Sequence, residues 1–201
     1  MASFLRLGSK YEIPRFRTEA VKRLLYEYPQ NIHALDTIHH NKQIRRCSSY
    51  ADEFFTTINL VRRYNVPEVL PWAFYACCLV LSKAEIKRST EPSLSIRDRE
   101  ICIKGRKHVL GQQALAWIYS ACPSEKEIAQ VCNAARRSVL KRDVHPLDCM
   151  ALVAWDATWQ RRLCQRCKVT AKASHNASRQ IIWNKLPSFF GLPEWTELME
   201  E

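Results

Sequence analysis

The chain has 201 residues, 47% of them hydrophobic and 25% charged, which fits one domain or two small ones with an ordinary apolar core. Only four glycines occur, too few for a glycine-rich phosphate loop or many hairpin turns, so the composition favours an all-α fold. Lysine plus arginine outnumber aspartate plus glutamate by 31 to 20, and the resulting charge of +11 attracts polyanions without proving a nucleic-acid role.

The N-terminal stretch has neither the long apolar centre nor the cleavage site of a signal peptide. The longest uncharged apolar run, VLPWAFYACCLVL at 69–81, falls short of the roughly 20 residues that span a bilayer, and it indicates a buried helix instead. We therefore expect an intracellular protein, cytoplasmic or nuclear, that has no membrane partner. Its nine cysteines, an odd number, are expected to be reduced there.

One phrase occurs twice in the first half of the chain. LRLGSKYEIPRFRTEA at 5–20 aligns with INLVRRYNVPEVLPWA at 58–73, so that apolar residues, a tyrosine and a proline coincide. Proline lacks an N–H group and suits the first turn of a helix, and it pushes the residue before it out of the helical region. Each copy therefore predicts two helices joined by a corner, at Pro14 and at Pro67. Two such pairs predict a small array of helical hairpins.

The rest of the chain predicts further helices. Between the two copies we expect a loop with a short helical piece, and the polar stretch KRSTEPS at 87–93 is the best candidate for a linker. Ser95 and Asp98 resemble a capping box that opens a long helix, bent near Gly105 or Gly111. Beyond it, the pattern predicts helices at about 124–141, 146–162 and 171–184, and an irregular aromatic clasp at 186–195.

Several phrases resemble, in order, the C-terminal helical portion of fungal BTB (POZ) domain proteins. They are LRLGSKYEIPRFRTEAVKRLLYEYP, INLVRRYNVPEVLPWAFYACC, LSIRDREICIKGRKHVL, LCQRC, a histidine at 175, and IIWNKLPSFFGLPEW. The resemblance implies that residues 1–86 form the end of a BTB-like fold plus BACK-like helical hairpins. Residues 94–201 would then form a C-terminal helical subdomain. The strand-containing BTB core of that family would precede residue 5 and is largely missing.

The same resemblance implies a non-enzymatic protein-interaction role. Members of that family act as scaffolds or as substrate adaptors of cullin-type ubiquitin ligases, so it implies a protein partner and, by resemblance alone, a cullin-type ligase. No catalytic motif such as GxSxG, HExxH or a dinucleotide fingerprint occurs in the sequence, and we expect no enzyme activity.

The cysteines offer one candidate metal site. LCQRC places Cys164 and Cys167 in the CxxC spacing that supplies two zinc ligands, and Cys122 and Cys132 upstream could complete a tetrahedron. His175, eight residues after the CxxC pair, is an alternative ligand. The competing interpretation is a set of reduced, partly buried cysteines at helix ends. A structural zinc is therefore a hypothesis, and no other cofactor is predicted.

The alternative function is a basic, nucleic-acid-binding helical domain that zinc could stabilise. Its candidate contact residues cluster in ARRSVLKRD at 135–143, namely Arg136, Arg137, Lys141 and Arg142. Aromatic residues do not alternate with these charges as a stacking surface requires. The sequence therefore favours a protein-interaction module over a nucleic-acid binder.

Overall fold

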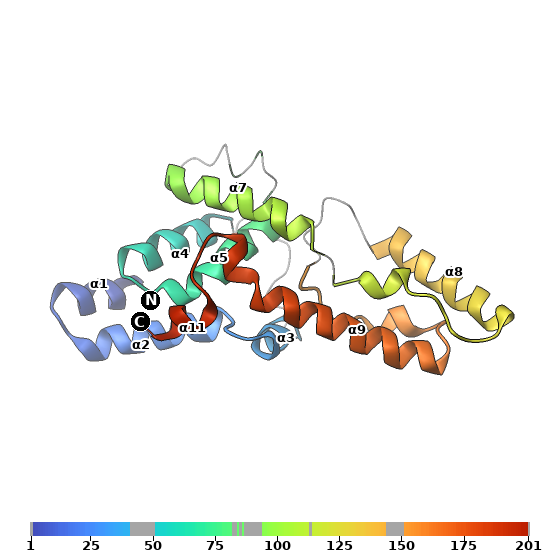
Figure 1. The fold of residues 1–201 in the computed structure, drawn as a ribbon. Helices are drawn as coiled ribbons and strands as arrows, with labels where there is room; N and C mark the ends of the chain where they lie inside the picture. The colour runs from blue at the N-terminus through green and yellow to red at the C-terminus, as the bar shows by residue number, and fades with distance from the viewer. Residues whose placement is uncertain are drawn as a thin grey trace. The chain divides into compact units, whose positions relative to one another are not determined.

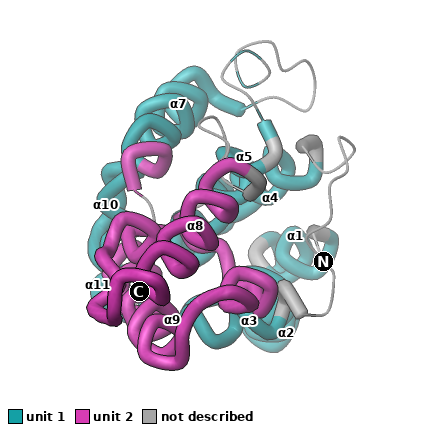
Figure 2. Tube along the Cα trace, turned by 90° about the vertical axis from the view of Figure 1, so that its right-hand side faces the viewer, with its two compact units in different colours: residues 1–108, 185–201 teal, residues 109–184 magenta. Residues whose placement is uncertain are grey.

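A computed structural model describes residues 2–40, 51–81, 84, 86, 94–112, 114–143 and 151–200 (Figure 1). Every regular element in these ranges is helical and none is a strand, which confirms the all-α prediction. The chain forms two compact units (Figure 2). Unit 1 comprises residues 1–108 and 185–201, and unit 2 comprises residues 109–184.

This division differs from the predicted one. The expected linker at 87–93 lies outside the described residues. Residues 94–108, together with the C-terminal stretch from residue 185, belong to the same unit as the N-terminal hairpins rather than to a separate subdomain. The physical reason is that both segments pack on the apolar helix that begins at residue 70, as described below.

The helices of unit 1 are α1 (Ala2–Lys10), α2 (Pro14–Glu27), α3 (Ile32–His40), α4 (Ala51–Arg63), η2 (Pro67–Val69), α5 (Leu70–Val80), α7 (Ile96–Leu110), α10 (Leu186–Phe189) and α11 (Trp195–Glu200). The last two residues of α7 fall in unit 2. Unit 2 otherwise contains η3 (Ala116–Tyr119), α8 (Lys126–Asp143), η4 (Ala157–Gln160) and α9 (Gln165–Asn184). The predicted short helical piece after the first hairpin corresponds to α3.

The first copy of the repeated phrase forms the predicted corner. The N–H of Ile13 donates to the carbonyl of Gly8 at 2.9 Å, and Glu12 between them has a φ of 49°. A hydrogen bond that spans six residues and encloses a residue in the left-handed conformation is the Schellman motif. It satisfies backbone carbonyl groups at the C-terminal end of a helix. Pro14 then opens α2 at its first position, where the missing N–H costs nothing.

The second copy repeats this local structure. The N–H of Val66 donates to the carbonyl of Val61 at 3.0 Å, Asn65 has a φ of 51°, and Pro67 opens η2. The guanidinium of Arg17 in α2 donates to the carbonyl of Asn65 at 3.2 Å, so the first hairpin helps to cap the second. The repeat in sequence is thus a repeat in structure, and the prediction of two helical corners is confirmed.

Gly8 lies where α1 closely approaches the backbone of α2. A Cβ at this position would lie 2.7 Å from the backbone nitrogen of Arg17, an atom that cannot move away without shifting α2. We expect Gly8→Ala to lower the free energy of unfolding by about 1–2 kcal/mol, because the clash outweighs the helix propensity that alanine adds. Urea denaturation followed by circular dichroism measures the change. A variant as stable as the parent protein would contradict this close approach.

Helix α5 forms the centre of unit 1. Its residues from Pro71 to Cys78 are all buried, and the helix has no polar face, as expected of a helix surrounded by other elements. The Sγ atom of Cys78 lies 3.9 Å from that of Cys102 in α7, and the ring of Phe74 stacks on Phe190 with centroids 5.4 Å apart. Cys77 and Cys78 are 0% and 1% exposed, so the prediction that the apolar run at 69–81 is a buried helix is confirmed.

Ser95 and Asp98, predicted to resemble a capping box, bond to each other at the start of α7. The N–H of Asp98 donates to the Ser95 hydroxyl at 3.0 Å, and that hydroxyl donates to the Asp98 carboxylate at 2.8 Å. The same carboxylate pairs with Arg62 of α4 at 3.0 Å. Arg62 also lies over the ring of Phe74, so its charge and its stem connect α4, α5 and α7.

The helix after residue 94 is shorter than predicted. It ends at Leu110, beside Gly111, and Trp117 belongs to a separate 3-10 helix in the core of unit 2. Ile96, in the first turn of α7, is 78% exposed. The predicted helix at 146–162 is also wrong where the structure describes it, because residues 151–156 are turn and coil and only η4 follows. Helices at 126–143 and 165–184 confirm the other two predictions.

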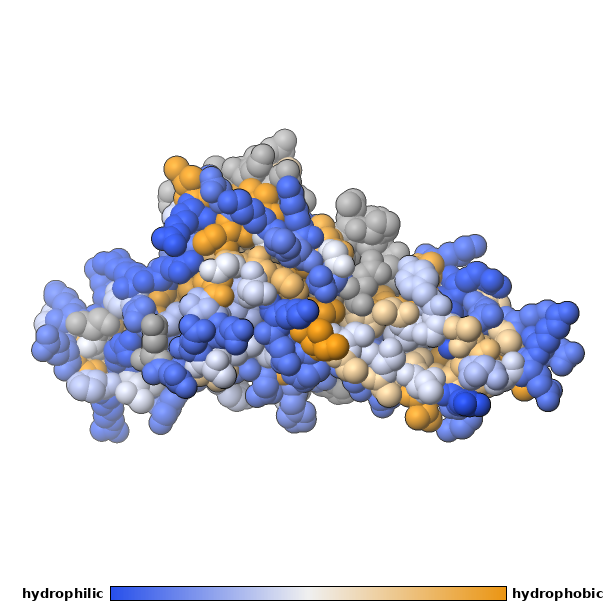
Figure 3. Space-filling model, viewed as in Figure 1, coloured by the Kyte–Doolittle hydropathy of each residue, from blue (hydrophilic) through white to orange (hydrophobic). Residues whose placement is uncertain are grey.

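Residues 186–195, expected to be irregular, comprise the short α10, turn and coil at 190–194 and the first residue of α11, and Pro187 and Phe190 are buried in unit 1. Hydrophilic residues cover most of the face drawn in Figure 3, and hydrophobic ones appear in small separate patches. Within the described residues, no helix combines the length and the apolar character that crossing a bilayer requires.

Candidate metal centre

Four cysteines converge in unit 2 from three separate segments. Cys122 lies in the loop before α8, Cys132 lies in α8, and Cys164 and Cys167 lie immediately before and within the first turn of α9. Their Sγ atoms all lie within 4.8 Å of one another. We call these four residues the cysteine cluster. It contains the same four residues that the sequence predicted as a zinc site.

The spacing of the sulfur atoms suits a single tetrahedral ion. The Sγ atoms of Cys122 and Cys164 lie 3.9 Å apart. A tetrahedron with Zn–S bonds of about 2.3 Å has an edge of about 3.8 Å. None of the four is in a disulfide. The cluster could therefore hold a metal ion between four thiolates.

Neighbouring donors favour the thiolate form of two of these residues. The N–H of Cys167 lowers the pKa of Cys164 to about 6, and the Ser124 hydroxyl, 3.6 Å from its Sγ atom, contributes in the same direction. The N–H of Ser124 likewise lowers the pKa of Cys122. Because Cys164 precedes the first turn of α9, the positive end of the helix dipole adds to this stabilisation.

The other two thiols lie deeper. Burial raises the pKa of Cys132, and burial together with the Cys122 and Cys164 thiols raises the pKa of Cys167 to about 12. The backbone N–H of Cys164 donates to the Sγ atom of Cys132 at 3.1 Å. Four thiolates this close together repel one another, so a bound cation is what would let all four lose their protons together.

A buried arginine supplies positive charge beside the cluster. Arg136 is 3% exposed, and its Nη2 donates to the Sγ atom of Cys167 at 3.3 Å. Its Nη1 donates to the carbonyl of Ser120, and it forms no salt bridge with a described carboxylate. A guanidinium is costly to bury without an anion. Four thiolates around a divalent ion would carry a net charge of −2, which would provide that anion.

His175 is not part of the cluster. It lies eight residues after Cys167 in α9, about 12 Å further along the helix axis. Its two ring nitrogens each lie 3.0 Å from a backbone carbonyl oxygen, that of Ala114 and that of Val153. The ring is fully buried, with Trp155 and Trp159 packed edge-on against it. The prediction of His175 as an alternative ligand is therefore wrong, because both nitrogens hold structural contacts.

The four basic residues proposed to contact nucleic acid do not share one surface. Arg136 faces the cysteine cluster, as described above, and cannot reach a ligand in solution without leaving its contacts. Arg137 and Lys141 are exposed. The side chain of Arg142 lies outside the described residues. Arg137 and Lys141 therefore remain as surface candidates, and the prediction for Arg142 stays untested.

Sequence reasoning missed two features around thiols. Arg136 follows Cys132 by one helical turn, and this i, i+4 spacing on the buried face of α8 was the available signal. In unit 1, Cys102 lies beside Cys78, and no spacing motif in the sequence pairs these two residues. Among the described residues, the thiols around Cys78 and Cys102 do not form a group that could hold a metal ion, so we interpret them as packed core.

Compared with protein-family models, curated proteins and solved structures, the chain matches none. The resemblance to fungal BTB proteins and the role that it implies therefore stay predictions. The function has to be inferred from the site itself.

Proposed function

We propose that this protein is a non-enzymatic, helical protein-interaction module whose unit 2 is held together by a structural zinc ion. Cys122, Cys132, Cys164 and Cys167 would be the ligands. The observation that carries the proposal is the convergence of four sulfur atoms from three segments at tetrahedral spacing. Four protein thiolates leave no open position for water or substrate, and such closed sites are structural rather than catalytic.

The cluster would join parts of unit 2 that also share an apolar core. It would connect the loop before α8, α8 itself and the start of α9, and Cys132 and Cys167 lie in one buried core with Trp117 and Trp159. Arg136 would balance the charge of the zinc–thiolate group through its bond to Cys167. A scaffold or adaptor role, with a cullin-type ligase as one partner class, follows the sequence resemblance and belongs to the same proposal.

Metal content tests the proposal. The protein is purified without chelators, and its zinc is measured by mass spectrometry against protein concentration. We expect one zinc per chain, no visible absorption of the kind that iron gives, and loss of zinc in the Cys164→Ser, Cys167→Ser double variant. Cys78→Ala, which removes a buried thiol from unit 1, is the matched control and should retain the zinc. A well-folded protein that binds no metal would overturn the proposal.

A further inference from the structure

A groove with basic walls crosses unit 2 beside the cysteine cluster. It runs between α8 and the segment around η4 and has a volume of about 550 Å³. Val131, Ala135, Val139 and Trp159 contribute apolar atoms to its lining. A second hollow of about 460 Å³, lined by Ala134, Arg137, Ser138 and Lys141, continues it along α8. The two hollows share Ala134 and Ser138, and we call them together the α8 groove.

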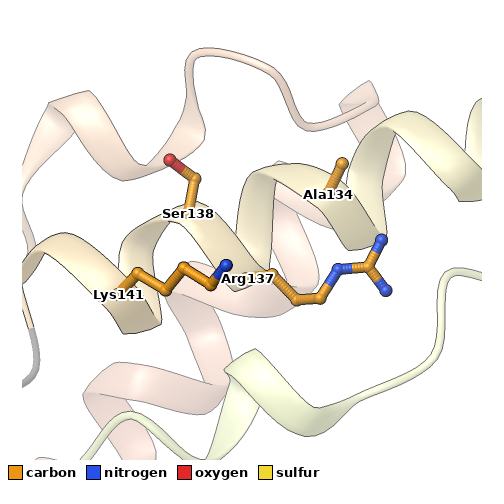
Figure 4. A pocket seen from close by; sticks show the side chains of 4 residues that line it. All are labelled: Ala134, Arg137, Ser138 and Lys141. Atoms are coloured by element: carbon orange, nitrogen blue, oxygen red, sulfur yellow. The ribbon is translucent and has the colours of Figure 1, made fainter.

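Positive charge lines both sides of the α8 groove. Arg137 and Lys141 lie on one face of α8, as Figure 4 shows, with Ser138 and Ala134 on the adjoining face. Arg161 and Arg162 line the opposite side, after η4. All four side chains are exposed, and none forms a hydrogen bond or ion pair with a described residue. No aspartate or glutamate lines either hollow.

We propose that the α8 groove binds an acidic peptide segment of a partner protein, with apolar side chains on the groove floor and carboxylates at the four cations. The inference rests on the proposed function, because it names the chemistry of the partner. Cationic side chains on two opposite sides suit an extended or helical peptide that lies between them and carries acidic side chains on both of its sides. Apolar atoms on the floor suit the buried side chains of a peptide.

These features favour a peptide over nucleic acid. A single strand requires exposed aromatic rings on which bases stack, but Trp159, the aromatic residue in the groove lining, is 3% exposed. The phosphates of a nucleic acid would also contact the cations but would leave the apolar floor of the groove without a partner. The zinc site would support the groove directly, because Cys132 lies in the α8 wall and Cys164 follows the η4 wall after Arg162.

Fluorescence anisotropy on the zinc-loaded full chain tests the inference. The probe is a short labelled peptide that carries glutamate and leucine at helical spacing. Two control peptides replace every glutamate by glutamine or every leucine by alanine. We expect the acidic, apolar probe to bind, and each control peptide to bind about tenfold more weakly. An unlabelled oligothymidine strand is the competitor, and we expect it to displace the probe poorly.

Protein variants locate the site. Arg137→Gln with Lys141→Gln, and Arg161→Gln with Arg162→Gln, should each weaken probe binding about tenfold. Arg166→Gln with Lys172→Gln removes the same charge from exposed positions of α9 that do not line the groove, and it should leave binding within about twofold. Each variant is checked for parental zinc content and circular dichroism before the measurement.

Three results would overturn the inference. Equal weakening by the α9 control pair would mean diffuse charge attraction, and tighter binding of oligothymidine than of the probe would mean a nucleic-acid surface. Absence of probe binding by protein that contains one zinc per chain would remove the groove as a peptide site and leave the metal centre standing. Protein that contains no zinc would instead contradict the proposed function, so the experiment distinguishes failure of the groove from failure of the metal site.

Discussion

Removal of zinc with an excess of a strong chelator is expected to unfold unit 2. The cysteine cluster would connect three segments of this unit, and structural zinc contributes about 10–16 kcal/mol to the folding of small zinc domains. Two of the cluster residues share one core with Trp117 and Trp159. Loss of the metal should therefore expose these rings, shift the tryptophan fluorescence to longer wavelength and abolish much of the near-ultraviolet circular dichroism.

Reconstitution provides the control for this experiment. Addition of zinc to the chelated protein should restore both spectra, whereas magnesium, which prefers oxygen ligands, should not. Cys122→Ser leaves three thiolates and should release zinc at a lower chelator concentration than the parent protein. Cys78→Ala should behave as the parent does. Spectra that remain unchanged after the zinc has been removed would show that the metal does not hold unit 2 together.

The second large effect is expected at Phe190. Its side chain is 2% exposed, and its ring stacks on Phe74 of α5. The ring also fills the space beside Gly105 of α7, where a Cβ would lie 2.1 Å from Cδ1 of Phe190. Phe190→Ala should therefore lower the free energy of unfolding by about 3–5 kcal/mol, through lost apolar burial and the cavity that remains.

The adjacent phenylalanine is a matched control for this prediction. Phe189 is partly exposed, and its ring lies parallel to that of His108 with centroids 6.4 Å apart. Phe189→Ala removes the same atoms and should cost clearly less than Phe190→Ala. Urea denaturation followed by far-ultraviolet circular dichroism compares the two variants. Equal losses at both positions would contradict the packing of Phe190 between α5 and α7.

Local signals in the sequence predicted local structure well. The repeated phrase contains its own corner, because the proline and the residue before it restrict the backbone wherever they occur. Ser95 and Asp98 likewise start a helix through hydrogen bonds to each other, which do not depend on distant residues. The helices at 126–143 and 165–184 have an amphipathic period long enough to be recognised without knowledge of their neighbours.

Features that depend on distant residues were predicted less well. The expected helix at 146–162 failed because Trp155 and Trp159 pack against His175 from a segment of coil and η4, a tertiary contact that overrides helical periodicity. The four cysteines could be selected, since Cys164 and Cys167 have recognisable spacing. Arg136, by contrast, is predicted from sequence to be a surface charge, because its partner Cys167 is 31 residues away in the chain.

The order of segments along the chain has a consequence for synthesis on the ribosome. Unit 2 interrupts unit 1, whose last segment begins only at residue 185. Phe190, which covers Phe74 and Gly105, is therefore translated after all of unit 2. Until that last segment is added, Phe190 cannot cover the apolar surface of α5. A chain that ends before residue 185 would thus contain all of unit 2 and leave part of the hydrophobic surface of α5 exposed, the kind of surface that chaperones bind.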